Sequence, residues 1–334
     1  MSTPPAAALA LPILDAELEA RLRARMLEVE DALEAAIQSE AEFVTRAARH
    51  LMHAGGKRFR PLLVLLAAEC GDPYADGVVT AACVVELTHL ASLYHDDVMD
   101  EAVLRRGADS ANARWDNLVA ILTGDFLFSK SSELTAELGR DAVRIQAKTF
   151  TRLVEGQILE TLGPVDGEDP LEHHLRVVAG KTGSLISTSA RYGARFSGAS
   201  PEVEAALTAY GEKVGCAFQL SDDILDIASE SQESGKTPGT DLREGVPTLP
   251  VLIARRSTDP ADRRLLELLG SDLSDDSLHA EALDLLRKHP AMAEARAYVL
   301  DRANEARELL HVLPEGPVRE ALDAFAGLIA TRTS

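Results

Sequence analysis

The stretch GVVTAACVVELTHLASLYHDDVMD, residues 77–100, combines a long apolar segment with an acidic cluster at its end. It is apolar through most of its length, which predicts one long helix that ends near Asp100. Three carboxylates, Asp96, Asp97 and Asp100, crowd this end of the segment. A buried carboxylate without a partner costs several kcal/mol. The cluster must therefore either face water or hold something positive.

The composition predicts an all-α protein. The chain has 334 residues, of which 46% are hydrophobic, and this is ample for a core. Aromatic residues make up only 4%, and few segments alternate β-branched residues with the period of two that strands require. No repeat of fixed period and no linker is visible. We expect a single domain over residues 1–334, with residues 1–14 flexible.

Apolar residues at three and four spacing place the helices, and Gly and Pro mark their ends. Residues 228–246 form the one long polar, glycine-bearing loop, and loops of that length are often functional. The predicted helices cover 15–53 as one or two helices, about 61–70, 77–100, 115–138, 140–161, 171–179, 182–197 and 201–227, with four or five more in 247–333.

Charge and cysteine usage exclude several classes of protein. The net charge of −20 disfavours attraction to nucleic acid or to an anionic membrane surface, so an anionic ligand needs a local basic cluster. Cys70, Cys83 and Cys216 lie far apart in apolar contexts, which indicates small core residues in a reducing compartment. No run approaches the roughly 18 to 20 apolar residues of a membrane span. The stretch AAALALPIL near the start fails as a signal peptide. We expect a soluble, cytoplasmic protein without a membrane anchor.

The acidic motif DDVMD at 96–100 has a twin, DDILD, at 222–226. In a helix the first and fifth positions lie on one face, so the outer acids of each motif project together. Like charges at that spacing repel, whereas Mg²⁺ favours one or two carboxylates together with substrate phosphates. One such motif alone is as readily a solvated helix end. Two motifs of the same form, each at the end of a mostly apolar helix, favour a metal site.

Basic residues stand close to both acidic motifs. GGKRFRP at 55–61 places three cations behind two glycines and before a helix start, where backbone N–H groups also favour anions. Arg105 and Arg106 follow the first motif, Lys181 opens a predicted helix, and Lys236 follows the second motif. The alternative for any one of them is a simple ion pair with an aspartate. Taken together, these residues suit a site for metal-bridged diphosphates.

Helix spacing adds two polar residues to the site. His89 stands seven residues before Asp96, and therefore two turns along the same face. A lone histidine on an apolar face is more often a satisfied core residue, but this alignment makes a diphosphate contact about as probable on the residues alone. Gln219 stands three residues before Asp222, so its amide can face the same cavity as the second motif.

At this point the sequence resembles the trans-isoprenyl diphosphate synthases, also called polyprenyl synthetases. The resemblance implies a bundle of antiparallel helices around a central elongation cavity, the isoprenoid synthase type, in a homodimer. The motifs occur in the family's order over roughly 200 residues, and they are GGKRFRP at 55–61, DDVMD at 96–100, RRG at 105–107, GD at 124–125, KTGSL at 181–185, FQLSDDILD at 218–226, GKTPGTDL at 235–242 and TLP at 248–250.

The resemblance also implies roles for individual residues. Val246 stands where many relatives have lysine, which leaves one basic contact in doubt. The resemblance implies about three Mg²⁺ ions per active site. The implied metal ligands are Asp96, Asp100 and Asp222, supported directly or through water by Asp97, Asp223 and Asp226. The implied allylic-substrate residues are Arg105, Lys181, Thr182, Gln219 and Lys236, and the implied isopentenyl diphosphate residues are Lys57, Arg60, His89 and Arg106. The catalytic set is Asp96, Asp100, Lys181, Gln219 and Asp222.

The implied reaction joins isopentenyl diphosphate head to tail to an allylic prenyl diphosphate and releases pyrophosphate. Three alternatives remain at this stage: a short-chain farnesyl or geranylgeranyl diphosphate synthase, a class I terpene cyclase, and a non-catalytic partner subunit. The low aromatic content and the intact GGKRFRP argue against a cyclase. All six acids are present, which argues against a non-catalytic subunit.

Product length is expected to depend on the side chains beneath the first acidic motif, because bulk there blocks the growing tail. Ala91 and Ser92, one turn before Asp96, are small, whereas short-chain members of the family carry aromatic residues in this region. Leu87 and Thr88, one turn deeper, are not aromatic either. We therefore predict a long-chain all-trans product, with Phe150 as the floor of the cavity.

Overall fold

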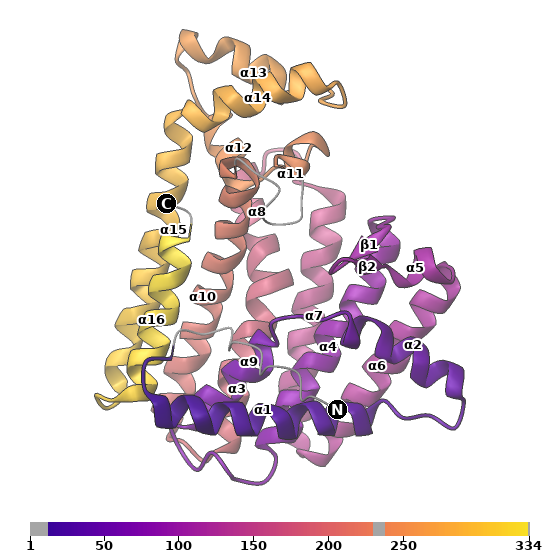
Figure 1. Cartoon of the computed structure of the whole chain (residues 1–334). Helices are drawn as coiled ribbons and strands as arrows, with labels where there is room; N and C mark the ends of the chain where they lie inside the picture. Colours follow the sequence, from indigo (N-terminus) through magenta and orange to yellow (C-terminus); the bar gives the residue numbers. More distant parts are fainter. Residues whose placement is uncertain (1–12, 230–237, 333–334) are drawn as a thin grey trace. The chain divides into compact units, whose positions relative to one another are not determined.

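The computed structural model describes residues 13–229 and 238–332, and it confirms the all-α prediction (Figure 1). Within these residues the only strands are β1 (Leu104–Arg105) and β2 (Ala108–Asp109), which form a two-stranded antiparallel hairpin. The chain divides into two compact units. Unit 1 comprises the residues up to Phe150 together with Leu185–Thr208 and Leu310–Ala324, and unit 2 comprises Thr151–Ser184, Ala209–Leu309 and the residues from Phe325.

The helices follow the predicted order closely. Short turns of other helical types are η1, a π-helix (Ala179–Gly183), and two 3₁₀ turns, η3 (Pro260–Asp262) and η4 (Leu309–Val312). The α-helices are α1 (Ala16–Ala36), α2 (Glu42–His53), α3 (Phe59–Ala68), α4 (Val78–Met99), α5 (Ala111–Arg114), α6 (Asn117–Glu137), α7 (Arg140–Leu162), α8 (Pro170–Val178), α9 (Ser184–Phe196), α10 (Pro201–Ala228), α11 (Thr240–Arg243), α12 (Leu249–Ala254), α13 (Arg263–Leu269), α14 (Asp276–Lys288), α15 (Pro290–Glu308) and α16 (Pro317–Thr331).

Two local predictions were wrong, and one element was not anticipated. The expected break between helices at 179–182 is instead the π turn η1, which joins α8 to α9 without an interruption. The loop expected over 228–246 contains α11, although residues 230–237 lie outside the described part. The hairpin β1–β2 was not expected, because strands of two residues leave no periodic pattern in the sequence.

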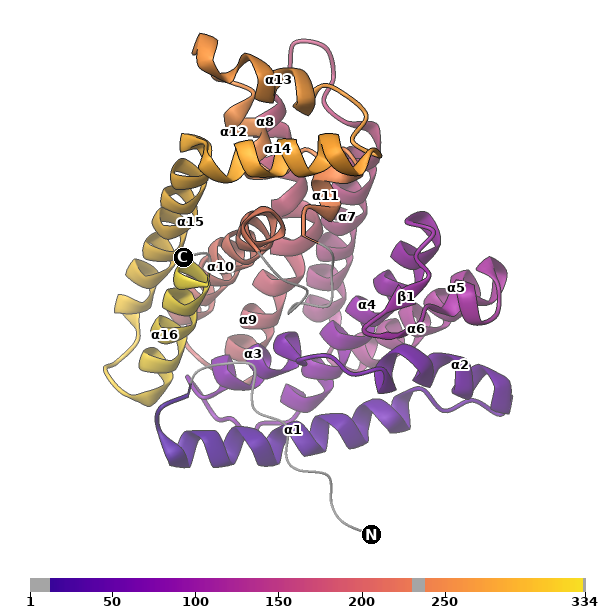
Figure 2. The same ribbon diagram turned by 45° about the horizontal axis from the view of Figure 1, so that its top comes forward.

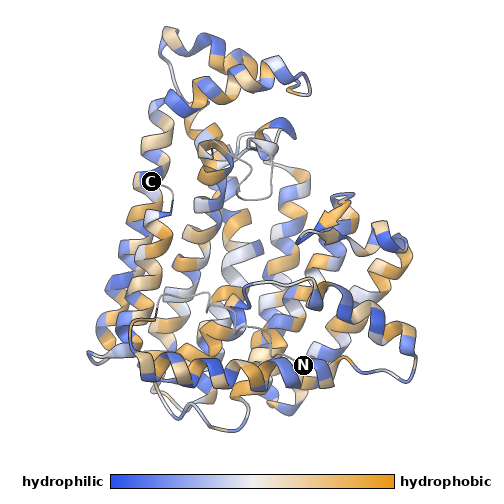
Figure 3. Cartoon of the chain, in the orientation of Figure 1, coloured by the Kyte–Doolittle hydropathy of each residue, from blue (hydrophilic) through white to orange (hydrophobic). Residues whose placement is uncertain are grey.

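Helices α3 and α4 form the core of unit 1. Every residue of α3 from Pro61 to Ala68 is buried, as its uniformly apolar sequence predicts. Helix α4 packs against α3 and α6, and α1 lies across α3 and α4 with an alternation of apolar and polar residues (Figures 1 and 3). By length and hydropathy α4 could cross a membrane, contrary to the prediction that no segment comes close. Two thirds of its apolar window is buried inside the protein, so it is a core helix.

Close backbone approach and one buried tyrosine fix the packing of unit 1. The hydroxyl of Tyr94, on α4, donates to the carbonyl of Ala47 at 2.5 Å and accepts from the N–H of Leu51 at 3.2 Å, which joins α4 to α2. Gly193, on α9, faces α3 so closely that a Cβ atom there would lie 2.2 Å from the carbonyl oxygen of Val64. Only glycine allows this helix crossing.

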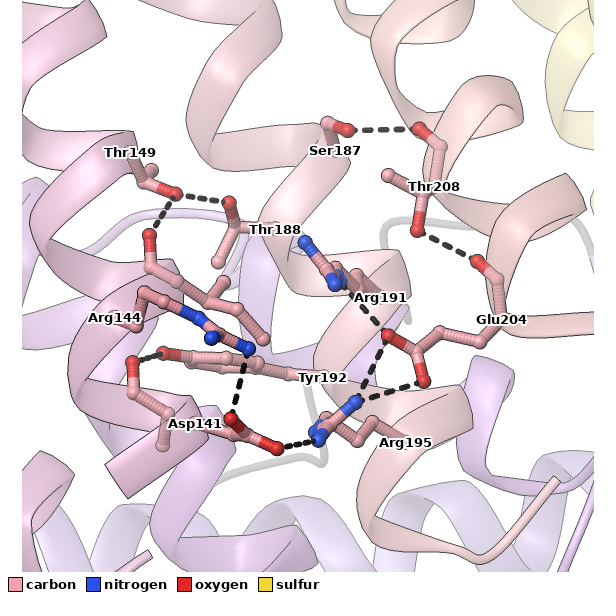
Figure 4. A network of polar contacts seen from close by, with 12 residues as sticks. Asp141, Arg144, Thr149, Ser187, Thr188, Arg191, Tyr192, Arg195, Glu204 and Thr208 are labelled. Atoms are coloured by element: carbon pink, nitrogen blue, oxygen red, sulfur yellow. Dashed lines mark hydrogen bonds and ion pairs between the residues drawn. The ribbon is translucent and has the colours of Figure 1, made fainter. Parts of the chain in front are cut away.

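A network of polar contacts holds α9 in unit 1 (Figure 4). The Tyr192 hydroxyl donates to the carbonyl of Ala142 at 3.0 Å, and Arg195 bridges Asp141 at 2.5 Å and Glu204 at 3.2 Å (Figure 4). Helix α9 is therefore joined to Asp141 and Ala142 near the beginning of α7 and to Glu204 near the beginning of α10. Figure 4 also shows two hydroxyl contacts deeper in the unit: Thr149 with Thr188 at 2.6 Å, and Ser187 with the carbonyl of Thr208 at 2.7 Å.

Unit 2 is built around the last part of α10. Helix α12 packs on both α8 and α15, and α14 crosses the beginning of α15 (Figure 2). Pro250, near the beginning of α12, is suited to a first helical turn because it has no N–H to leave unpaired. All six residues of α12 are buried, so this short helix is a central element of the unit.

The crossing of α9 and α3 can be tested with Gly193→Ala. The added methyl group collides with backbone atoms that cannot move aside, so we expect a loss of about 1–3 kcal/mol in the free energy of unfolding. Gly327→Ala is the matched control, because its Cβ atom would meet nothing within 4 Å in helix α16. The control should gain about 0.5–1 kcal/mol from helix propensity. Denaturant unfolding measures both, and equal effects of the two substitutions would contradict the close packing.

Candidate active site

The first acidic motif lies at the end of α4, where its three carboxylates have different surroundings. Asp100 caps the helix end and is exposed, whereas Asp96 is half-buried. Asp97 is completely buried and accepts a hydrogen bond of 2.6 Å from Nε of Arg105. Burial raises the pKa of Asp97, and the Arg105 guanidinium works in the opposite direction. Asp97, expected to support a metal ion, therefore points into the protein and holds Arg105.

The hairpin after α4 positions the two arginines of RRG. Arg106 and Gly107 form its turn with positive φ values of 56° and 78°. The Arg106 guanidinium donates to the carbonyls of Leu51 and Gly55, at the end of α2. A Cβ atom on Gly56 would lie 2.7 Å from this guanidinium, and the φ of 127° at Gly56 also favours glycine. Gly56 thus lies against Arg106, whereas Gly55 meets nothing within 4 Å and is favoured by its φ of 100°.

A cluster of arginines surrounds one buried carboxylate, Glu86 of α4. Arg58, in the left-handed conformation with φ of 47°, donates to Glu86 at 3.1 Å and to Glu30 at 2.7 Å. Burial lowers the pKa of Arg60 to about 10, with a further contribution from the nearby Arg106. The Nε atom of Arg60 is buried without a hydrogen-bond partner. A cationic group with an unmet donor suits an anion such as a diphosphate.

His89 lies on α4 beside this guanidinium cluster. Burial holds the pKa of its imidazole well below the usual range, and Arg60 and Arg106 lower it further. His89 is therefore neutral at pH 7, when one ring nitrogen is a donor and the other an acceptor. Lys57, the remaining residue predicted for isopentenyl diphosphate, is exposed. The structure thus brings Arg60, Arg106 and His89 together.

The second acidic motif lies near the end of α10 in unit 2, and each of its acids has a partner. Oδ1 of Asp222 lies 2.5 Å from Nη2 of Arg332, the residue after α16. Oδ2 of the buried Asp223 accepts from His174 on α8 at 2.9 Å and from the N–H of Leu249 at 3.2 Å. Asp223 therefore ties α10 to both α8 and α12.

Asp226 anchors the short helix α11. Its two carboxylate oxygens accept from the N–H groups of Thr240 at 3.1 Å and Asp241 at 3.2 Å. Its carbonyl also accepts from Gly239 at 2.7 Å. An acidic group at the beginning of a helix satisfies free N–H groups and complements the helix dipole. Asp226 thus fixes Gly239 and the beginning of α11, and Lys236 lies outside the described residues.

The KTG segment lies in the π turn η1. Here Nζ of Lys181 pairs with Glu160 of α7 at 2.5 Å, and the Thr182 hydroxyl donates to Oε1 of Gln219 at 3.1 Å. A Cβ atom on Gly156 of α7 would lie 2.5 Å from the backbone nitrogen of Lys181, so α7 and the π turn touch along their backbones. Single π turns are common at functional sites because they displace a side chain from the regular helical position. Thr182 and Gln219, both implied for the allylic substrate, are thus in contact with one another.

The donor set suits Mg²⁺ held jointly with a phosphate. In the described part of the chain, no three acidic, histidine or cysteine side chains converge on one point as in a closed metal site. Mg²⁺ does not need such a cage, because it binds through one or two carboxylates plus phosphate oxygens and waters. Of the motif acids, Asp97 and Asp223 are buried, whereas Asp96, Asp100 and Asp222 are at least partly exposed to solvent.

Sequence analysis missed three residues of the site: Glu86, His174 and Arg332. Glu86 stands ten residues before Asp96 in an apolar helix, and its burial was a usable signal, because a buried acid needs a cationic partner. His174 and Arg332 gave no such signal. Their partners are 49 and 110 residues away in the sequence, and only the fold brings them to the second motif.

The predicted chain-length residues lie in unit 1, and most are well packed. Leu87, Thr88 and Ala91 are fully buried, and the Ser92 hydroxyl donates to the carbonyl of His89 at 2.8 Å. The Thr88 hydroxyl accepts from Gln146 of α7 at 2.7 Å and contacts Ser131 of α6 at 2.8 Å. The ring of Phe150 lies 4.6 Å from that of Phe128, between α7 and α6. Phe150 is 36% exposed, and its role as the floor stays a prediction.

The all-α fold, the paired acidic motifs and the separate arginine cluster define an enzyme of the class that handles diphosphates with divalent metals. Residues 41–286 match the polyprenyl synthetase family. The chain therefore belongs to this family, as its motifs indicated, and it is a prenyltransferase of the polyprenyl diphosphate synthase type.

Individual relatives cover nearly the whole chain. The nonaprenyl diphosphate synthase of Mycobacterium tuberculosis (strain ATCC 25618 / H37Rv) is 48% identical over 99% of each chain. A structure of geranylgeranyl pyrophosphate synthase from Corynebacterium glutamicum, complexed with calcium and isoprenyl diphosphate, is 46% identical with a TM-score of 0.89, over 97% of this chain and 99% of that one. A decaprenyl diphosphate synthase from Rhodobacter capsulatus is 34% identical with a TM-score of 0.87, over 95% and 99%.

The different roles of Asp100, proposed to bind metal, and Asp97, which holds Arg105, can be tested with Asp100→Asn and Asp97→Asn. The Asp100 carboxylate is exposed, so its neutralisation should lower kcat/KM by about 10²–10³ as for other electrostatic catalytic groups, while the melting temperature stays unchanged. Asp97→Asn weakens a buried contact with Arg105 and should in addition cost about 1–3 kcal/mol of stability. Steady-state kinetics and thermal unfolding separate the two effects. Full activity of the Asp100 variant would exclude it as a metal ligand.

Proposed function

We propose that this enzyme catalyses the Mg²⁺-dependent head-to-tail condensation of isopentenyl diphosphate with an allylic prenyl diphosphate. The products are a long-chain all-trans polyprenyl diphosphate and pyrophosphate. The observation that carries this proposal is the arginine cluster around Glu86, a buried acid that is not one of the six motif acids. An elongating enzyme must bind two diphosphates, and this cluster is suited to the second one.

The proposed roles follow from the surroundings of each residue. About three bound Mg²⁺ ions supply electrostatic stabilisation of the pyrophosphate that leaves the allylic substrate. Asp96, Asp100 and Asp222 hold the metal, and Asp97, Asp223 and Asp226 support them by holding Arg105, His174 and α11 in place. The allylic diphosphate is bound by Arg105, Lys181, Thr182, Gln219 and Lys236, and isopentenyl diphosphate by Lys57, Arg60, His89 and Arg106.

The proton lost after condensation is proposed to go to the departing pyrophosphate. His89 lies among guanidinium groups that depress its pKa, so its imidazole is a poor base and a better hydrogen-bond partner for a diphosphate. No other side chain is needed as a base in this scheme. In this scheme the side chains of the protein bind and orient the two diphosphates and neutralise their negative charge.

The alternatives differ in what they require of the site. A class I terpene cyclase binds one diphosphate, so it does not need the arginine cluster around Glu86 as a second diphosphate site. A non-catalytic subunit does not require the six motif acids that this chain retains. A short-chain synthase is the closer alternative, since the geranylgeranyl pyrophosphate synthase of Corynebacterium glutamicum is 46% identical. The small side chains Ala91 and Ser92, and the 48% identity to a nonaprenyl diphosphate synthase, favour the long-chain product.

We further propose a homodimer in the cytoplasm. In unit 1, Leu118, Ile121 and Leu122 of α6 are between 40% and 64% exposed, and an apolar helix face of this kind favours burial against a second copy. The cysteines Cys70, Cys83 and Cys216 are unpaired, and burial raises the pKa of each thiol, which suits a reducing compartment.

The reaction is tested by incubating the purified chain with Mg²⁺, farnesyl diphosphate and labelled isopentenyl diphosphate, and separating the products by length. We expect incorporation into long-chain products, none in the presence of a chelator, and none with the Asp96→Asn variant. A cyclic hydrocarbon formed without isopentenyl diphosphate would identify a cyclase. Incorporation that appears only after a second protein is added would identify a subunit of a heteromeric synthase.

The floor of the elongation path is tested with Phe150→Ala. Removing the ring opens space beside Phe128, so the mean product should become longer while the rate of the first condensation is preserved. Val143→Ala is the matched control, because Val143 is also an exposed apolar residue of α7, about two turns away. Products of unchanged length from the Phe150 variant would show that the floor lies elsewhere.

A further inference from the structure

The second acidic motif of unit 2 contacts a cation from a distant part of the chain. Nη2 of Arg332 lies 2.5 Å from Oδ1 of Asp222, and the guanidinium carbon lies 4.7 Å from the centroid of the Phe218 ring. Phe218 and Asp222 are four residues apart on α10, so their side chains share one helix face. Arg332 is therefore held from two sides, by a carboxylate and by an aromatic face.

This contact differs from those of the neighbouring acids. Asp223 is held by His174 and a backbone N–H, and Asp226 by the N–H groups at the beginning of α11, so their partners belong to packed helices. Asp222 is paired with a flexible side chain that lies beyond the end of α16. The pair is also more accessible, with 27% of the Arg332 side chain and 43% of the Asp222 side chain exposed. This partner can leave without unfolding a helix.

We propose that the Arg332 guanidinium pairs with Asp222 in the absence of metal. When Mg²⁺ binds to the second acidic motif, it displaces this guanidinium from the carboxylate. The inference rests on the proposed function, in which Asp222 is a metal ligand. A magnesium ligand oxygen must come within about 2.1 Å of the ion, and a second cation on the same carboxylate opposes this by charge repulsion. The guanidinium also offsets the repulsion among the three acids of the motif before metal arrives. Arg332 is thus a positioning residue that sets how much Mg²⁺ the motif requires.

Thermal unfolding of the full chain with and without Mg²⁺ tests the displacement, with the ionic strength held constant by NaCl because surface ion pairs are screened by salt. In a chelator, Arg332→Met should lower the melting temperature by about 1–3 °C, the effect expected of a partly exposed ion pair. As Mg²⁺ is added, this deficit should shrink to zero. The Mg²⁺ concentration that gives half of the stabilisation should be about two- to five-fold lower for the variant, because the Arg332 guanidinium no longer competes with the metal.

Two further variants separate displacement from a structural role. Arg287→Met is the matched control, since Arg287 donates to the carbonyls of Ile227 and Ser229 at the same end of α10 and touches no motif acid through these bonds. Its stability deficit should be the same with and without Mg²⁺. Phe218→Leu keeps Arg332 but removes the aromatic face, so it should also lower the Mg²⁺ requirement, by a smaller factor than Arg332→Met.

Loss of the Arg332→Met deficit on addition of Mg²⁺, with the Arg287→Met deficit unchanged, supports the inference. A deficit of equal size in chelator and in Mg²⁺ overturns it and leaves the proposed function intact. A wild-type melting temperature that Mg²⁺ does not raise overturns it as well, because the metal then does not compete for Asp222. The incorporation assay with labelled isopentenyl diphosphate decides independently whether the proposed function also fails.

Discussion

The carboxylates at the ends of the apolar helices carry negative charge that cations or hydrogen-bond donors must compensate. This requirement determines most of the contacts in the site. Each acidic motif follows a long stretch of core residues, and an acid that is drawn into the core must find a cation or several hydrogen-bond donors. Asp97 holds Arg105, and Glu86 holds Arg58. In unit 2, Asp223 holds His174 and Asp226 holds the N–H groups of α11. Asp97, Asp223 and Asp226 thereby fix neighbouring segments, whereas Asp96, Asp100 and Asp222 are the acids proposed to hold the metal.

Two kinds of residue appear together wherever the backbone comes close to the site. Glycine permits close approach, as at Gly56 beside Arg106 and at Gly156 beside the π turn that carries Lys181. Arginine then fills the space with a planar donor group that can satisfy carbonyl and carboxylate oxygens at once. Other glycines of the basic motifs, Gly55 and Gly107, meet nothing within 4 Å and are favoured by positive φ values of 100° and 78°.

Much of the architecture was predictable because helical periodicity is a local property. The apolar run of α3, the length of α4 and the order of the later helices all follow from spacing along the sequence. The hairpin β1–β2 and the π turn η1 were not predicted, since each depends on tertiary contacts rather than on a repeating pattern. Among the site residues, spacing identified Asp96 with Asp100 and Gln219 with Asp222. It could not tell which acids of each motif are buried, because burial depends on segments far away in the sequence.

The sequence by itself determined the helical class, the two acidic motifs, the basic motifs GGKRFRP and RRG and, through their order, membership of the polyprenyl synthetase family. These features are encoded in neighbouring residues, whose periodicity and chemistry can be read without knowing the fold. Only the tertiary structure decided the partner of each charge. Asp222 meets Arg332 across 110 positions of the sequence, and Asp223 meets His174 across 49. Ion pairs of this kind form after the helices have packed, because a side chain can select its partner only among the groups that the fold brings within a few ångströms.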